Sequence, residues 1–188
     1  MGSNTMAYNV KEFGTRGEEI IRWLDREFAS IRTGRATPML LDLVLVESYG
    51  TRVPIQQIGT VNVEDPRTLR VSVWDKDAIK NVEKAIIDAD LGVSVVVDGA
   101  GLRVIFPELT SERRVQLLKI AKAKLEEARV SLRGARDEAM KEIEKLEKEG
   151  GMGQDEKFVL KETIQKHVDT FNATLNESLE TKEKEINS

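Results

Sequence analysis

The chain has 188 residues, 40% of them hydrophobic, which is enough apolar material to bury one sizeable core or two smaller ones. Without cysteine it forms no disulfide and no cysteine-ligated metal site, and no apolar run approaches the roughly 20 residues of a membrane-spanning helix. The net charge of −4 argues against a protein that binds nucleic acid over its whole surface. We expect a folded cytoplasmic protein without a signal peptide, whose native start is Met6, after the five residues MGSNT.

The first predicted element is a helix over Ala7–Thr33. Its apolar residues recur at spacings of three and four, as on one face of a helix: Val10, Phe13, Gly17, Ile20, Leu24, Phe28 and Ile31. The segment SIRTGRATP, Ser30–Pro38, comes next, and its Gly34 and Pro38 are residues that end helices. They indicate either an ordinary helix stop or the point where the chain crosses into a second structural module.

The middle of the chain predicts a small module rich in β-structure. Short, β-branched and partly alternating segments indicate five strands: Leu43–Tyr49, Ile58–Val63, Leu69–Trp74, Val93–Asp98 and Leu102–Phe106. Turn signals at SYGT, EDPRT and DGAG separate the strands, and the apolar spacing within Asp77–Ala89 predicts one short helix. Two crossings, at Thr33–Pro38 and Phe106–Thr110, must join this module to the helices around it. Such a double connection confines relative motion to a hinge.

Two long helices are predicted in the second half of the chain. The first covers Thr110–Lys148, with Thr110 as its cap and an apolar face formed by Leu118, Ala121, Leu125, Ala128, Leu132, Ala135, Ala139, Ile143 and Leu146. Three glycines in KEGGMGQDE then interrupt the helical pattern, and Asp155 is expected to cap the next helix, Asp155–Glu185. The apolar stripe of that helix is Phe158, Lys161, Ile164, Val168, Phe171, Leu175, Leu179 and Ile186, with the lysine burying only its stem.

These elements predict an α+β fold with two domains. Residues 7–34 and 107–187 form an elongated three-helix bundle, because three amphipathic helices can share one apolar seam. Residues 35–106 form a small α/β domain inserted into it.

The sequence offers little support for catalysis. His167 is the only histidine, and no local motif supplies partners for a catalytic relay, so a solvated position on a helix face is expected. The glycines of GGMGQ fit neither a dinucleotide fingerprint nor a phosphate-binding loop, because no strand precedes them and no Lys-Ser or Lys-Thr pair follows. The many acids alternate with lysines at helix-surface spacing. We therefore expect no enzyme activity, cofactor or metal.

The charge is unevenly spread along the two long helices. Residues 110–136 contain eight Lys or Arg against three acids, whereas residues 137–188 contain eight Lys against fourteen acids. Four basic residues each follow a position of the apolar face by one residue, so they lie about 100° round the helix from it. We expect them to form one solvent-exposed row: Lys122, Arg129, Arg133 and Arg136. Arg113 and Arg114 add charge near the start of the helix, and Glu126 is the sole acid at an equivalent position within the row.

Such a row suggests an external polyanion, because arginine can donate two hydrogen bonds to one phosphate and a helix fixes the spacing. Structured RNA is read largely through shape and phosphates. An arginine-rich face that serves only solubility is the other interpretation, and composition does not decide between them.

Over nearly its whole length the chain resembles the ribosome recycling factor family. The segments that carry the resemblance occur in the family's order and spacing: IRTGRATPMLLD at Ile31–Asp42, VEDPRTLRVSVWD at Val63–Asp75, VEKAIIDADLG at Val82–Gly92, LRVIFPELTSERR at Leu102–Arg114 and EEARVSLRGARDEA at Glu126–Ala139. The resemblance implies an L-shaped, tRNA-like outline with the bundle as the long arm. It also implies binding to the post-termination ribosome and separation of its subunits together with elongation factor G and GTP.

Residue by residue, the resemblance implies that the bundle face contacts large-subunit ribosomal RNA. Basic family positions match Arg114, Arg129, Arg133 and Arg136, and Lys122 extends this predicted rRNA-binding set. Two positions depart from the family pattern: Gly134 replaces a usual asparagine and Asp137 a usual arginine.

The resemblance also implies that the small domain swings about the paired crossings. We assign this hinge to Arg32, Gly34, Arg35, Pro107 and Glu108. The two arginines beside the glycine either orient the joint through hydrogen bonds to carbonyls or acids, or touch RNA.

Three classes of function remain distinguishable by experiment. A monomeric ribosome-binding factor is favoured, and its affinity for ribosomes should fall steeply with salt. A coiled-coil interaction protein would self-associate without RNA, and an enzyme would turn over a small substrate. The residues do not distinguish a bacterial cytosol from an organelle.

Overall fold

The computed structural model describes residues 8–188, so Met6 and Ala7, the expected starts of the native chain and of its first helix, lie outside the described residues. The three long helices lie outside the middle of the chain, which contains all six strands together with one short helix, and the two-domain α+β class is confirmed. Among the described residues, one compact unit contains residues 8–31 together with 111–188, and the other contains Arg32–Thr110.

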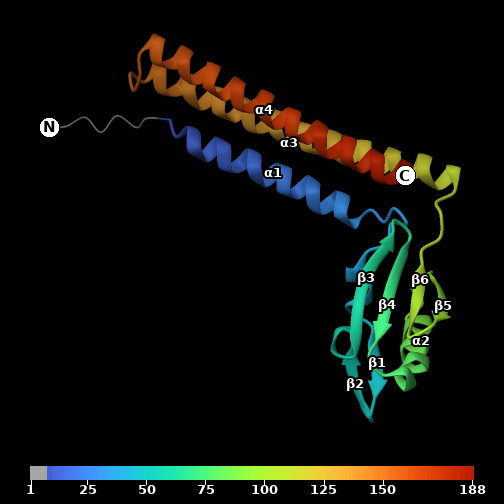
Figure 1. Cartoon of the computed structure of the whole chain (residues 1–188). Coiled ribbons are helices and arrows are strands. Elements are labelled where there is room, and N and C mark those ends of the chain that lie inside the picture. The colour runs from blue at the N-terminus through green and yellow to red at the C-terminus, as the bar shows by residue number, and fades with distance from the viewer. Residues whose placement is uncertain (1–7) are drawn as a thin grey trace. The chain divides into compact units, whose positions relative to one another are not determined.

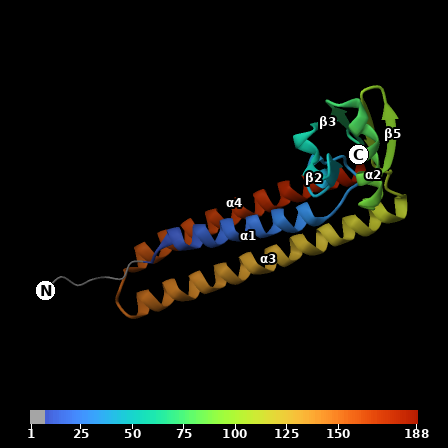
Figure 2. The ribbon, with the colours of Figure 1, turned by 90° about the horizontal axis from the view of Figure 1, so that it is seen from below.

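The first unit is a bundle of three helices, α1 (Val10–Ser30), α3 (Ser111–Lys148) and α4 (Gln154–Asn187). Figures 1 and 2 show the three running side by side, with the α3–α4 turn near the start of α1. Apolar residues at helical spacing from all three helices are buried in one seam: Phe13, Leu24, Phe28, Leu117, Ala121, Leu125, Ala128, Leu132, Ala135, Ala139, Ile143, Ile164, Val168, Leu175 and Ile186. Leu118, expected in this seam, is half-buried, and Leu117 takes the buried place.

The close approach of α1 to α4 depends on a glycine. A Cβ added to Gly17 would lie 2.1 Å from the ring of Phe171, so a larger residue here would force the ring or the helices to shift. The same ring stacks on His167, with centroids 6.0 Å apart, and both rings lie near Phe13. The prediction of a solvated histidine was therefore wrong, because His167 is half-buried among aromatic rings.

The helix ends differ in detail from the predictions. Asn9 caps α1 by accepting a hydrogen bond from the backbone N–H of Lys11, and the helix ends at Ser30 because Ile31 is extended. Gly153, with no side-chain cap, precedes α4, so Asp155 lies in the first turn instead of capping it. Phe158 is 64% exposed and does not belong to the buried stripe.

The second unit contains two antiparallel sheets and one helix. A two-stranded sheet pairs β1 (Leu45–Ser48) with β2 (Thr51–Pro54). A four-stranded sheet has the order β3 (Gly59–Asp65), β4 (Thr68–Val73), β6 (Gly101–Ile105) and β5 (Ser94–Asp98). Helix α2 (Ile79–Asp88) packs against β1, β5 and β6, and short 3-10 turns lie at Pro38–Leu41, Ile55–Gln57 and Lys76–Ala78.

This unit has a core of its own, and β2 is the element that the sequence did not predict. The core residues come from both sheets, α2, the 3-10 turns and the loop positions beside them: Leu41, Val44, Val46, Ile55, Leu69, Val71, Val73, Ile79, Val82, Ile86, Leu102, Val104 and Phe106. Tyr49 and Gly50 both have positive φ, 49° and 81°, and reverse the chain between β1 and β2. Strand β2 has only four residues and ends in proline, so its sequence does not show the pattern of a strand. It is a strand because it pairs with β1.

Candidate nucleic-acid interface

The basic row lies on α3, and only part of it is fully exposed. Arg133 is exposed, whereas Arg129 and Arg136 are half-buried, so the expectation that all three are solvent-exposed was wrong for two of them. Side chains one residue beyond the buried seam lie at its edge, and α4 borders that edge. The structure therefore brings Arg129 and Arg136 against α4, while Arg133 faces outward.

Both half-buried arginines are held by amide side chains of α4. Arg136 Nε donates a hydrogen bond of 2.9 Å to Gln165 Oε1, and the Nε2 of the same amide donates 2.9 Å to Asp169 Oδ1. Arg129 Nη2 donates to Asn176 Oδ1. These amides were not predicted as site residues, because nothing in a helix sequence marks which polar positions face a neighbouring helix.

Arg133, between the two half-buried arginines, is exposed to solvent. Its side chain is 62% exposed, and its Nη2 lies 3.7 Å from Glu126 Oε1 on the preceding turns of the same helix. An exposed ion pair of this length contributes little and is easily exchanged for another anion. The guanidinium of Arg133 is therefore available to an external ligand.

Acids accompany the basic residues beyond this central part of the bundle. Lys122 Nζ lies 3.9 Å from Glu183 Oε1 on α4. Toward the α3–α4 turn, Lys161 pairs with Glu144 at 2.7 Å and Lys157 with Glu147 at 3.5 Å. Positive charge without an acidic partner on α4 is thus concentrated around Arg129, Arg133 and Arg136.

The other predicted binding residue and the two departures from the family pattern lie on the same helix. Arg114 is half-buried near the start of α3, and its Nε is enclosed without a hydrogen-bond partner among residues 8–188. Asp137 is exposed beside the row. A Cβ added to Gly134 would meet nothing within 4 Å, so this glycine is not required by packing.

The predicted hinge residues lie on the two crossing segments, which touch each other. Gly34 has φ of 73°, and a Cβ added to it would lie 2.9 Å from the carbonyl oxygen of Pro107. Both segments are also attached to the β3–β4 turn, because Ala36 N–H donates to Pro66 O and Phe106 N–H donates to Arg67 O, each at 2.8 Å.

Arg67, which was not predicted, forms the side-chain contacts of this joint. Its Nη1 donates 3.4 Å to the carbonyl of Pro107, and its Nε lies 3.8 Å from Glu108 Oε1. Arg32 and Arg35 are exposed, and within residues 8–188 neither guanidinium forms a hydrogen bond or an ion pair, although the carbonyl of Arg35 accepts from Thr37 Oγ1. No side-chain bond within the described residues supports the first alternative, and the assignment of these two arginines to the hinge stays a prediction.

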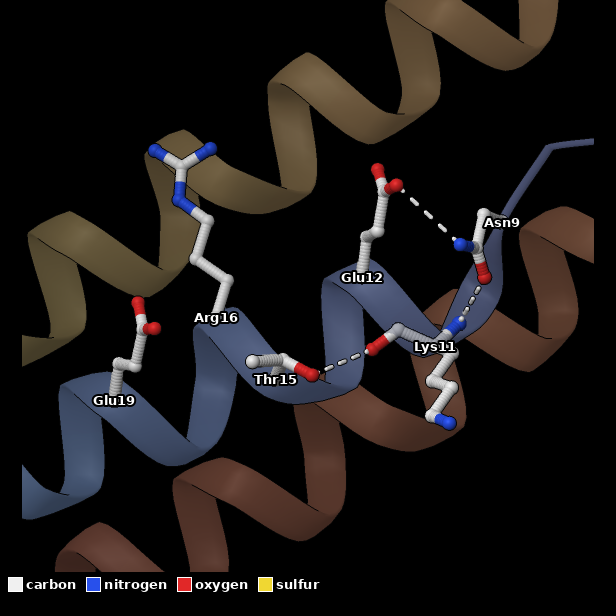
Figure 3. A pocket seen from close by; sticks show the side chains of 6 residues that line it. All are labelled: Asn9, Lys11, Glu12, Thr15, Arg16 and Glu19. Atoms are coloured by element: carbon white, nitrogen blue, oxygen red, sulfur yellow. Dashed lines mark hydrogen bonds between the residues drawn. The ribbon is translucent and has the colours of Figure 1, made fainter.

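A surface depression of the described residues lies away from the arginine row, on α1. This depression of about 330 Å³ is lined by Asn9 and by residues of α1 alone: Lys11, Glu12, Thr15, Arg16 and Glu19 (Figure 3). In residues 8–188 no group of three His, Cys, Asp or Glu side chains could hold a metal ion, and no helix is long and apolar enough to cross a membrane.

The fold is that of a two-domain α+β protein with a row of arginines on one long helix. Comparison with known proteins identifies its family. The family model for ribosome recycling factor matches residues 24–186. Curated ribosome-recycling factors are similar: that of Carboxydothermus hydrogenoformans is 43% identical over 177 residues, covering 94% of this chain and 96% of the relative. That of Bacillus velezensis is 42% identical and covers 98% of each chain. The chain belongs to the ribosome recycling factor family.

Solved structures of ribosome recycling factors are also similar to this chain. A solution structure of the ribosome recycling factor is 37% identical with a TM-score of 0.62, covering 96% of this chain and 98% of that one. The T. thermophilus ribosome recycling factor, described with E. coli elongation factor G bound to the E. coli post-termination complex, is 41% identical with a TM-score of 0.58 and covers 94% and 96% of the two chains.

Proposed function

We propose that this protein binds the post-termination ribosome through large-subunit ribosomal RNA and, with elongation factor G and GTP, separates the subunits. Membership of the family supports the overall activity, and a solved relative is described on a post-termination complex with elongation factor G. The observation that carries the binding mode is the placement of Arg129, Arg133 and Arg136 on one straight helix, with the central guanidinium exposed.

The chemistry of this face suits RNA phosphates. Guanidinium groups donate paired hydrogen bonds to phosphate oxygens and keep their charge at any physiological pH. Three of them within two helical turns span about 10 Å at roughly 1.5 Å per residue, a length over which a structured RNA backbone presents more than one phosphate. Arg114 and Lys122 extend the face toward the start of α3.

The two compact units supply the second part of the proposal. We assign residues 7–34 with 107–187, and residues 35–106, to two domains that act as separate bodies, joined by the segments of Gly34 and Pro107. Binding then depends on the bundle, while subunit separation depends on movement of the inserted domain when elongation factor G acts. The protein works as a monomer in this scheme, with no cofactor or metal of its own.

Ribosome co-sedimentation tests the binding mode. The double variant Arg133→Glu/Arg136→Glu should lose most of its binding, and wild-type binding should fall steeply with salt. A matched control, Lys141→Glu/Lys145→Glu, makes the same charge change further along the same helix, at two exposed positions. Equal loss of binding by both variants would point to general charge and not to this face.

A further inference from the structure

Two neutral residues of α4 occupy the places opposite Arg129 and Arg136. Elsewhere along the α3–α4 border the basic side chains reach acids: Lys122 with Glu183, Lys161 with Glu144 and Lys157 with Glu147. Although α4 is rich in acids, the two arginines instead reach the amides Asn176 and Gln165. The change from acidic to neutral partners coincides with Arg129 and Arg136, in the central part of the proposed interface, whereas Lys122, at its edge, reaches an acid.

We propose that Gln165 and Asn176 are positioning residues that orient Arg136 and Arg129 toward RNA phosphates without neutralising them. This inference rests on the proposed function, because it concerns how the arginine face of α3 stays oriented and charged for binding RNA.

The chemistry of the two partners supports this assignment. A guanidinium has five N–H donors and no acceptor, so the amide must present its oxygen and can occupy only part of the donor set. The remaining donors and the full positive charge stay available. A carboxylate at the same place would form a charge-assisted pair and compete with phosphate. Orientation in advance also lowers the conformational entropy lost on binding.

Gln165 has a second effect on the local charge. Its Nε2 donates to Asp169, so the amide lies between the carboxylate of Asp169 and the guanidinium of Arg136. The acid is thereby engaged by a neutral donor and does not pair with the arginine.

The test replaces each amide by its isosteric acid. Gln165→Glu and Asn176→Asp should each weaken binding to intact ribosomes roughly fivefold to tenfold, through loss of one charge-assisted contact. Each should also reduce the slope of log affinity against log salt by about one, because one fewer phosphate is neutralised. Thermal unfolding should be unchanged or shifted upward, since the new pair joins two helices.

Two controls make the same chemical changes on the same helix away from the arginines. Gln154→Glu and Asn187→Asp lie at the exposed ends of α4, each eleven positions from the residue it matches, and should bind as wild type. A neutral variant, Gln165→Met, removes the acceptor without adding charge, so it should weaken binding about twofold to threefold and keep the wild-type salt slope.

The outcomes separate this inference from the proposed function. If Arg133→Glu/Arg136→Glu weakens binding while Gln165→Glu and Asn176→Asp bind with wild-type affinity and slope, the positioning role is overturned and the interface stands. If the arginine variant also binds as wild type, the proposed function itself fails. A loss of equal size in Gln154→Glu would likewise overturn the inference.

Discussion

The ammonium group of Lys182, on α4, donates a hydrogen bond of 2.9 Å to the carbonyl oxygen of Ile31, the C-cap residue that follows α1. The lysine is 7% exposed and also pairs with Glu185 Oε2 at 3.2 Å. Because the last carbonyls of a helix have no partner within it, Lys182 satisfies the end of α1 from a neighbouring helix.

Lys182→Met should therefore destabilise the bundle. It keeps the apolar stem but leaves the Ile31 carbonyl without this donor, at a cost of about 1–3 kcal/mol in the free energy of unfolding. Urea unfolding monitored by circular dichroism measures the change. Lys184→Met, at an exposed position two residues further on, is the control and should stay within about 0.5 kcal/mol of wild type.

Gly34→Ala should destabilise the inserted unit for two reasons. Its φ of 73° is unfavourable for alanine by about 1–2 kcal/mol, and the added Cβ would lie 2.9 Å from Pro107 O. Gly92→Ala separates the two causes, because Gly92 has φ of 71° with nothing within 4 Å of the added atom. Unfolding measured for both variants should show the larger loss at Gly34, and equal losses would contradict a steric role for Pro107.

Arg133→Ala should weaken ribosome binding with almost no change in folding. Its side chain is exposed and forms only a weak pair with Glu126, so the free energy of unfolding should stay within about 0.5 kcal/mol of wild type. Arg136→Ala should weaken binding as well, but it also loses the bond to Gln165 and about 0.5–1.5 kcal/mol of stability. Thermal unfolding measures the stability of each variant, and co-sedimentation measures its ribosome binding. If Arg133→Ala lowered stability as much as binding, Arg133 would have a structural role.

Acid should destabilise the bundle through its inter-helix ion pairs. The hydrogen bond and charge of Lys161 hold the pKa of Glu144 below its ordinary value of 4.5, and Arg16 does the same for the pKa of Glu138. Since the folded pKa values are lower, the unfolded chain binds more protons as the pH falls below about 4.5. The two ion pairs therefore contribute fully to the free energy of unfolding above the pKa of the unfolded carboxyl. This contribution is lost as the pH falls through the pKa of the folded carboxyl.

A pH series of urea unfolding measures this effect. In Lys161→Met the pKa of Glu144 should return toward its ordinary value, so its stability should fall less between pH 5 and 3, roughly the range in which carboxylates titrate. If the stability of Lys161→Met fell with pH as much as that of wild type, the Lys161–Glu144 pair would not contribute to the acid sensitivity.

Much of the fold could be predicted from sequence because its signals are local. The periodic apolar residues of α1, α3 and α4 predicted three helices whose observed ends lie within a few residues of the expected ones. The β-branched segments likewise predicted five of the six strands. Strand β2 was missed because four residues ending in proline become a strand only through pairing with β1.

The row of basic residues along α3 could also be predicted from the sequence, since the positions of arginines around one helix follow from 3.6 residues per turn. Which of them face solvent was decided by tertiary structure. Their exposure depends on where α4 lies around α3, and single-helix periodicity carries no information about a neighbouring helix. For the same reason only the packed bundle shows that Gln165 and Asn176 meet the arginines and that Lys182 reaches Ile31, because these contacts join residues far apart in the chain.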